Sequence, residues 1–346
     1  MLRFLSAGES HGKAIISILE GMPAGLRIDL DFINKELRRR QSGFGRGRRM
    51  QLEKDQAKII SGIKNNITLG SPIALLIENK DVSIEKLKKI LCPRPGHADL
   101  AGLLKYRFTD IREVLERASA RSTAGLVSIG AVCKLFLREF GMQVSSKVIS
   151  IGDKYSKGEM LKKISEAIKN KDTLGGIFEV VAKGVVPGLG SYVHPDRRLD
   201  AKIAGNVMAI PGIKAVEIGL GFGYAEKFGS QVHDEIYYSK GKGFFRKTNN
   251  AGGIEGGISN GEDIIVRACM KPICTLTKPL KSVNIRTLSE AKAAVERSDT
   301  CVVEAAGVIA ESVVSYVLSD CFLEKFGSDS LRDIKEGFRI YLKRIR

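Results

Sequence analysis

Two long segments of small and apolar residues, 122–140 and 302–322, constrain the fold of this chain more than any other feature. Each has the length and pattern of a buried helix. A helix that is apolar all round has to be covered on every side. The chain has 346 residues, of which 43% are hydrophobic, so it is long enough to supply that cover.

Short apolar runs elsewhere in the chain are predicted to be strands that cover these helices. They lie at 14–19, 58–63, 73–77, 147–151, 178–186, 215–218 and 264–270. Strands and helices do not alternate regularly, which argues against a doubly wound parallel sheet. We therefore predict an α+β fold: one large domain over 1–346, with a layer of long helices sandwiched between antiparallel β-sheets.

Other segments predict further helices. Their patterns of apolar and polar residues indicate helices at 31–40, 81–90, 156–171, 199–210 and 288–296. Asp29 or Asp31 is the expected N-cap of the first. Residues 330–346 read as a basic amphipathic tail. No segment has the composition of an interdomain linker.

The charge of the chain indicates anionic partners. Lys and Arg number 56 against 39 Asp and Glu, which gives a net charge of +17. Such an excess is typical of proteins that bind nucleic acid, acidic membranes or polyanionic small molecules. No uninterrupted run of about 18 apolar residues occurs, so we expect no membrane span. The absence of a signal-peptide pattern and of any CxxC pair among six cysteines predicts a cytoplasmic protein with reduced thiols.

An arginine-rich and glycine-rich loop is the most basic part of the chain. Six arginines lie between positions 38 and 49, and glycines at 43, 45 and 47 separate them. Guanidinium groups form bidentate hydrogen bonds with carboxylates and phosphates, so the loop suits a small anion. A basic RNA-binding loop is the alternative. Phe44 is its only aromatic residue, however, and RNA recognition commonly uses stacking on aromatic rings.

Two histidines lie in tight loops of small residues. His97 closes the turn 94–97, where proline restricts φ and glycine permits a positive φ. His11 lies in Gly-Glu-Ser-His-Gly at 8–12, where no bulky neighbour blocks a ligand. Both loops therefore predict an imidazole that a ligand can reach.

Two more stretches suit anions. Arg117, Ser119 and Arg121 precede the first long apolar helix, and helix N-termini attract anions through their unpaired N–H groups. The turn 271–275 follows a strand and offers a lysine and a threonine hydroxyl.

Other conspicuous features match no known ligand motif. The glycine-dense segments 219–224 and 249–261 fit neither GxGxxG nor the P-loop. His194 and His233 lie in polar loops without a cysteine or carboxylate pattern that would bind a metal. We predict no metal site.

Together these residues resemble the chorismate synthase family. Eight motifs occur in the family's order: GESHG, RRRQSGFGRGRRM, GSPIALLIEN, RPGHAD, RASAR, GGISNG, KPxxT and RxD. The resemblance implies a phosphate lyase that converts 5-enolpyruvylshikimate 3-phosphate to chorismate by 1,4-anti elimination, in aromatic amino acid biosynthesis. It also implies reduced FMN as cofactor, NADPH as a possible reductant and a homotetramer that binds neither nucleic acid nor membrane.

The resemblance also implies roles for single residues. The catalytic residues would be His11, His97 and Asp299. The substrate would contact Arg40, Arg46, Arg49, Arg94, Arg121 and Arg297. The flavin would contact Arg40, Arg46, Arg117, Ala118, Ser119, Pro211, Gly212, Gly256, Lys271, Pro272, Ile273, Cys274, Thr275 and Arg297.

Three positions depart from the family's pattern. Ser122 stands in place of a glutamate, Arg107 in place of a glycine, and Glu304 in place of a proline. Ser122 puts one substrate contact in doubt. At this stage a basic RNA-binding protein and an FMN redox enzyme remain alternatives to the lyase.

Overall fold

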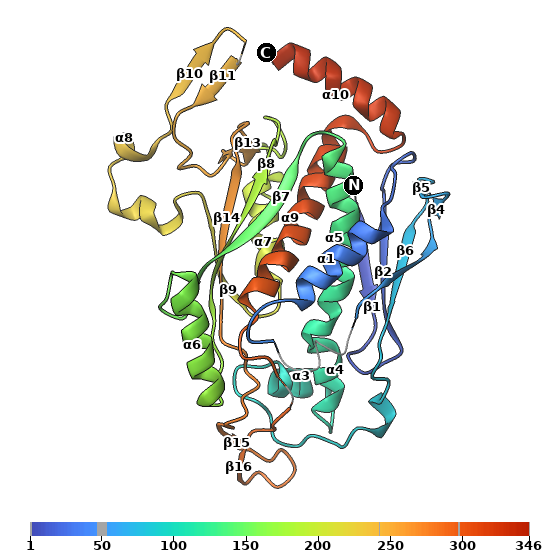
Figure 1. The fold of residues 1–346 in the computed structure, drawn as a ribbon, viewed down its shortest axis with the longest axis vertical. Helices are drawn as coiled ribbons and strands as arrows, with labels where there is room; N and C mark the ends of the chain where they lie inside the picture. The colour runs from blue at the N-terminus through green and yellow to red at the C-terminus, as the bar shows by residue number, and fades with distance from the viewer. Residues whose placement is uncertain (1, 47–53, 242, 297, 346) are drawn as a thin grey trace.

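The computed structural model describes residues 2–46, 54–241, 243–296 and 298–345. One four-stranded antiparallel sheet comes from the N-terminal part of the chain (Figure 1). Its strands, in spatial order, are β1 (Arg3–Ala7), β2 (Ala14–Glu20), β6 (Ile73–Glu78) and β3 (Ala57–Ser61). Side chains alternate across β2, so that Ile15, Ser17 and Leu19 are buried.

A second four-stranded antiparallel sheet comes from the middle of the chain. Its spatial order is β7 (Gln143–Ile151), β8 (Gly176–Lys183), β14 (Ile264–Met270) and β9 (Ile213–Ile218). Seven of these eight strands overlap segments that the sequence predicted, and β1 was not predicted.

The two long apolar segments form the central helices. α5 (Thr123–Arg138) packs against β2 and β6, and α9 (Val303–Phe326) packs against β7 and β8. The two helices also pack against each other (Figure 1). A Cβ on Gly130 would lie 2.1 Å from the Cβ of Ser312, so this glycine permits the close approach of α5 to α9.

Burial explains the hydropathy of these helices. Arg112–Arg138 and Val303–Phe326 are long and apolar enough to cross a membrane, but 78% and 89% of their apolar windows are buried within the protein. Around them one continuous hydrophobic core includes side chains from both sheets. The mixed helix-and-sheet fold in one domain is therefore confirmed.

Two helices flank this centre. α1 (Leu30–Gln41) packs against α5 and α9, and its N-cap is Asp29, whose carboxylate accepts the Phe32 N–H at 3.0 Å. α7 (Leu199–Met208) packs against α9 and β9. α6 (Lys157–Lys169) lies on the outside, and α10 (Leu331–Ile345) makes the predicted basic tail a helix.

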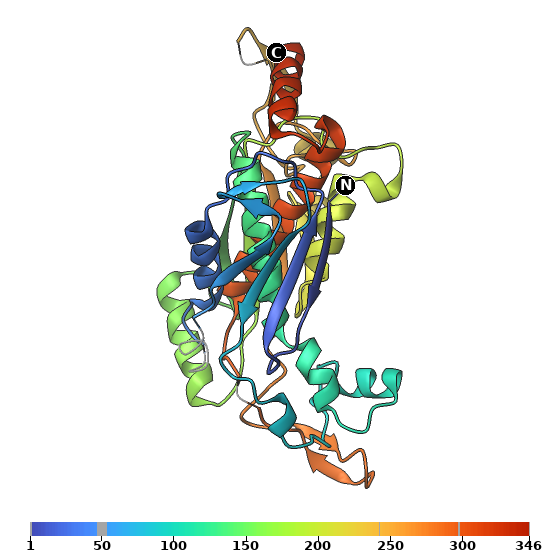
Figure 2. The same ribbon diagram turned by 90° about the vertical axis from the view of Figure 1, so that its right-hand side faces the viewer.

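One end of the molecule carries elements that position the site. α3 (Asp99–Tyr106) and α4 (Arg112–Ala118) lie there with the hairpin of β15 (Lys281–Val283) and β16 (Glu290–Lys292) (Figure 2, teal and orange). A small separate core of Ile90, Leu103, Ile111 and Leu115 holds them together. The sequence analysis did not predict α3 or α4.

The predicted helix at 288–296 is wrong, because part of it is the strand β16. Ala293 and Ala294 donate main-chain N–H groups to Leu280 and Cys92, and tertiary pairing thus overrides the helix propensity of this alanine-rich stretch. The predicted helix at 81–90 contains only the short 3₁₀ turn Ile84–Lys86, where the Ile84 N–H donates to the carbonyl of His11.

The remaining elements are short. Two-stranded hairpins are formed by β4 (Ile63–Lys64) with β5 (Ile67–Thr68), β10 (Ile236–Ser239) with β11 (Gly243–Arg246), and β12 (Ile254–Glu255) with β13 (Ile258–Ser259). Other single turns are 3₁₀ segments at Ala120–Ser122, Pro195–Arg197 and Gly221–Glu226, and the helical turn α8 (Gly229–Val232).

Candidate active site

The loop that carries His11 is fixed between β1 and β2. Asn79, directly after β6, donates its side-chain N–H groups to the carbonyls of Glu9 (3.1 Å) and Gly12 (2.7 Å). Gly8 has a φ of +117°, and a Cβ there would lie 2.2 Å from the carbonyl oxygen of Ala14. The loop therefore needs a glycine at its start, and it presents His11 in a fixed place.

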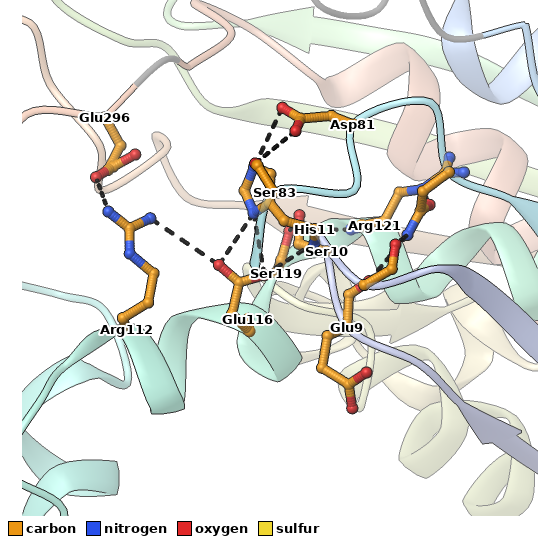
Figure 3. Close-up of polar contacts among 12 residues, drawn as sticks. Glu9, Ser10, His11, Asp81, Ser83, Arg112, Glu116, Ser119, Arg121 and Glu296 are labelled. Carbon is orange, nitrogen blue, oxygen red and sulfur yellow. Dashed lines mark hydrogen bonds and ion pairs between the residues drawn. The ribbon is translucent and has the colours of Figure 1, made fainter. Parts of the chain in front are cut away.

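His11 lies between two carboxylates (Figure 3). Its Nδ1 is 3.0 Å from both carboxylate oxygens of Glu116 on α4, and its main-chain N–H donates to the same carboxylate at 2.9 Å. Its Nε2 lies 3.9 Å from Asp81, on the other side of the ring. The ring is thus held at Nδ1, and Nε2 is the nitrogen on the opposite edge.

Glu116 is a buried carboxylate that stays ionised. Burial alone would raise its pKa, but hydrogen bonds from the ring and backbone of His11 and the nearby charge of Arg112 lower it. Arg112 Nη1 is 3.9 Å from Glu116, and its Nη2 donates to Glu296 at 2.9 Å. Figure 3 shows this row of charged groups running from His11 to Glu296.

A buried arginine pair lies close to this loop. Arg40, at the end of α1, and Arg121, just before α5, donate to the two oxygens of Asp55 at 2.9 and 2.6 Å. Arg121 also donates to the side-chain oxygen of Asn79 at 2.7 Å. The same asparagine therefore joins the His11 loop to the arginine pair.

The arginine pair carries more positive than negative charge. Arg40, Asp55 and Arg121 are 3%, 2% and 6% exposed, so within the described part of the chain two buried cations share one carboxylate. Burial lowers the pKa of Arg40 despite the charge of Asp55, while the two arginines lower the pKa of Asp55 against the effect of burial. Arg40 Nε is buried without a hydrogen-bond partner among the described residues. A buried cationic surplus with an unused donor suits an anionic ligand.

Ser119 and Arg117, both in the 117–121 segment, contact different parts of the His11 loop. Ser119 donates its hydroxyl to Ser10 at 3.2 Å, beside His11. Arg117 donates to the carbonyls of Ser6 (2.8 Å) and Gly8 (3.0 Å) and so braces the His11 loop from the exposed side. Ala118 ends α4 between them. The two arginines of this segment therefore do not form one cradle.

The turn at 94–97 forms a second group. Arg94 donates to both carboxylate oxygens of Asp99 at 2.8 and 2.9 Å, and His97 Nδ1 lies 2.5 Å from Asp99. Burial would raise the pKa of Asp99, but the hydrogen bonds from Arg94 and His97 lower it. Asp99 thus fixes both predicted site residues of this turn.

The segment 271–275 lies against this turn. Lys271 Nζ and the Cys274 thiol donate to the carbonyl of Gly96, and Thr275 accepts from Arg94 at 2.8 Å. The main-chain N–H of Lys271 donates to the carbonyl of Gly212 at 2.9 Å. Pro211 and Gly212 therefore adjoin Lys271, Pro272, Ile273, Cys274 and Thr275.

The remaining predicted residues lie at other places in the structure or outside the described residues. Arg46 pairs with Asp299 at 2.9 Å, near the start of α9, and its charge helps to lower the pKa of Arg40. Arg49 and Arg297 lie outside the described residues. Gly256 lies in the β12–β13 hairpin, at the end of the molecule opposite α3 and α4 (Figure 1). One chain therefore does not bring Gly256 to the other predicted flavin residues.

The glycine-dense segment at 249–261 has a structural explanation. Gly252, Gly253, Gly256 and Gly257 all have positive φ, and a Cβ on Gly252 would lie 2.5 Å from the Cα of Gly219. These glycines permit tight turns and close backbone approach.

Ser122, which stands in place of a glutamate, donates its hydroxyl to the carbonyl of Ser119 at 3.1 Å and adds no negative charge to the arginine pair.

Four site residues were missed in the sequence: Asp55, Asn79, Asp99 and Glu116. Glu116 is 105 positions from His11, so no local pattern connects them. Asp99 is different, because it follows Arg94 and His97 within the same motif. Asp99 is the acidic residue next to Arg94 and His97 in the sequence, so its role could have been predicted from the motif.

Comparisons with known proteins agree on one family. The chorismate synthase family model matches residues 2–323. Chorismate synthase of Thermoanaerobacter pseudethanolicus is 54% identical over 344 residues, covering 99% of this chain and 98% of that protein. The enzyme of Caldanaerobacter subterraneus subsp. tengcongensis is 53% identical over 348 residues, covering 100% and 99%. A chorismate synthase crystal structure matches with a TM-score of 0.83 at 42% identity, covering 99% of this chain and 98% of that one.

Proposed function

The chain belongs to the chorismate synthase family, and we propose that its buried arginine pair binds the phosphate or a carboxylate of the family's substrate. The family's reaction, a carbon–oxygen lyase reaction of aromatic amino acid biosynthesis, eliminates phosphate from 5-enolpyruvylshikimate 3-phosphate and forms chorismate. We also infer that the helices between the two sheets correspond to the family's sandwiched helical layer.

The observation that carries the proposed site is the charge surplus of Arg40 and Arg121 over Asp55. The substrate has one phosphate and two carboxylates. An anion that enters beside Arg40 would be paired without the removal of a carboxylate that already occupies the site. Arg46, Arg49, Arg94 and Arg297 stay predictions as further substrate contacts.

The second group of residues fits the phosphate and ring of reduced FMN. Lys271 offers an ammonium group, which donates to the carbonyl of Gly96, and a Cβ on Gly96 would lie 3.2 Å from the sulfur of Cys274. When bound, reduced FMN supplies the reduced ring that the family's elimination requires without net redox change. We propose that His97, oriented by Asp99, donates to or exchanges a proton with the bound cofactor.

His11 is the proposed acid for the leaving group. Phosphate departure builds negative charge on the bridging oxygen, and a preorganised donor lowers that barrier. The ring is already fixed by Glu116, so Nε2 is the atom that would deliver the proton. His11→Ala should lower kcat about 10- to 1000-fold with little change in substrate affinity.

Some expectations rest on the family alone. A homotetramer, a cytoplasmic location, reduced FMN rather than another flavin, and reduction by NADPH stay proposals. So does the expectation that the chain binds neither nucleic acid nor membrane. Activity with NADPH and FMN alone, compared with activity with chemically reduced FMN, would show whether the chain reduces its own cofactor.

The proposed site is tested by phosphate release under anaerobic conditions with chemically reduced FMN. Arg121→Met should raise the KM for the substrate about 100-fold, because one buried anion contact is lost. Arg38→Met, on the exposed side of α1, is the matched control and should change KM less than about 2-fold. Equal effects of the two variants would contradict the proposed site, and salt-sensitive RNA binding by the same arginines would favour the nucleic-acid alternative.

A further inference from the structure

Glu116 is the residue on which the position of His11 depends. Its carboxylate accepts both the main-chain N–H of His11, at 2.9 Å, and the ring at Nδ1, at 3.0 Å. Its main-chain carbonyl accepts the N–H of Ser10 at 3.0 Å. Glu116 is 4% exposed, so water does not compete for these contacts.

We propose that Glu116 is a positioning residue that holds the neutral His11 ring in the form protonated at Nδ1. An ionised carboxylate can only accept hydrogen bonds, so the nitrogen that faces it has to carry the hydrogen. The inference rests on the proposed catalytic role of His11, but it concerns a residue that neither the motifs nor the family resemblance singled out.

The consequence is that His11 exchanges protons only at Nε2. In the neutral ring the lone pair of Nε2 is the one that can accept a proton, and in the protonated ring Nε2 carries an N–H that can be given to a phosphate oxygen. After this transfer the ring is neutral again, with its hydrogen still on Nδ1. Glu116 keeps its charge throughout, as a carboxylate that orients an imidazole does in other acid–base sites.

The surroundings of Glu116 support this role. Arg112 lies 3.9 Å from the carboxylate, while its other terminal nitrogen is bound to Glu296, whose neighbour in the chain is Arg297. On the far side of the ring, Asp81 is the charged side chain 3.9 Å from Nε2. Glu116 thus accepts from His11 with a cation behind it, which keeps it an acceptor (Figure 3).

The test is ¹⁵N NMR of the full-length chain labelled at histidine. The chain has four histidines, so His11→Asn assigns the His11 signals by their loss. In the wild type at a pH where the ring is neutral, Nδ1 should show the shift of a protonated nitrogen and Nε2 that of an unprotonated one. In Glu116→Gln the amide can accept the main-chain N–H and donate to Nδ1, so the shifts should reverse.

Kinetics provide the second readout. Glu116→Gln should lower kcat about 10- to 100-fold with KM changed less than about 3-fold, since the wrong nitrogen then faces the substrate. Glu116→Asp keeps an acceptor-only group, so it should retain the Nδ1–H form and part of the activity. Glu113→Gln, on the exposed face of the same helix, is the control and should change neither readout.

The outcomes separate this inference from the proposed function. Unchanged ¹⁵N shifts with kcat within 2-fold of wild type in Glu116→Gln would overturn the positioning role. Reversed shifts in Glu116→Gln, together with full activity of both Glu116→Gln and His11→Ala, would uphold the positioning role and overturn the catalytic role of His11. If Glu116→Gln does not fold, loss of the Nδ1–H form in Glu116→Asp would overturn the inference, and its retention would support it.

Discussion

Arg39 and Arg40 are neighbours on α1, but they belong to clusters with different charge balance. Arg39 donates to Glu36 and Glu311, and Lys134 lies between the same two carboxylates. That cluster has two cations and two anions. Among the described residues, Arg40 and Arg121 share the one carboxylate of Asp55, so this cluster has two cations and one anion.

Charge balance distinguishes a buried binding cluster from a buried structural one. The hydrogen bonds that Arg39 donates to Glu311 raise the pKa of Arg39, whereas burial lowers the pKa of Arg40. The charged form of Arg39 is stabilised by its carboxylate partners, whereas the charged form of Arg40 is not fully compensated by negative charge. We infer that the balanced cluster stabilises the helical layer and that the unbalanced cluster is completed by substrate.

The largest expected effect comes from unbalancing the structural cluster. Lys134→Met would leave Glu36 and Glu311, both buried, with Arg39 as the one remaining cation of the cluster. The free energy of unfolding should fall by about 3–5 kcal/mol, because two buried carboxylates then share a single cation. Urea unfolding measures this change.

The matched double variant tests the cause. Lys134→Met combined with Glu311→Gln removes one charge of each sign and should recover part of the stability. In either variant the folded protein should keep its KM. A large rise in KM without loss of stability would show that the balanced cluster belongs to the active site.

Much of this contrast could not be predicted from the sequence. The arginine-rich loop indicated anion binding, but it did not show that Arg39 faces α9 while Arg40 faces Asp55. The two residues differ by one position on a helix, about 100° around its axis. Only the tertiary arrangement shows which carboxylates each one reaches.

The fold was easier to predict than the site. Patterns of apolar residues identified the central helices and every strand of the two main sheets except β1, because a buried element has a recognisable pattern of apolar residues. The alanine-rich stretch at 288–296 misled the prediction, since pairing with 281–283 outweighs its helix propensity. No local sequence pattern identified Glu116 or Asp55 as site residues, because their partners lie far away in the sequence.

Acid pH should weaken the balanced cluster in a defined direction. The pKa of Glu311 is lowered: burial opposes the shift, but Arg39 and Lys134 outweigh it. A carboxylate with a lowered folded-state pKa contributes stability above its unfolded pKa of about 4.3, and this is lost as the pH falls through the folded value.

Replacing Glu311 isolates its share of this loss. Unfolding free energies measured from pH 6 downward should decline less steeply in Glu311→Gln than in wild type, by up to about 1.4 kcal/mol per pH unit. Glu113→Gln, which is exposed, should keep the wild-type slope. Parallel curves for all three proteins would contradict the assignment.

The smallest expected change in stability comes from Arg107, which belongs to neither cluster. Arg107 ends α3 in the left-handed region, with φ of +56° and ψ of +37°, where the family usually has glycine. Arg107→Gly should relieve this strain and stabilise the protein by about 0.5–1 kcal/mol without a change in kcat or KM. Destabilisation in urea would show that the exposed arginine makes a contact worth more than the strain.

The central claim, that charge balance separates the structural cluster from the binding cluster, is tested most directly by one matched pair: Arg39→Met and Arg40→Met. For each variant the substrate Kd is measured by calorimetry and the unfolding free energy in urea. Arg40→Met should raise Kd about 100-fold or more with stability within about 1 kcal/mol of wild type. Arg39→Met should lower stability by about 1–2 kcal/mol, because solvent screens part of its interaction, with Kd within about 3-fold. Equal changes in Kd for the two variants would contradict the claim.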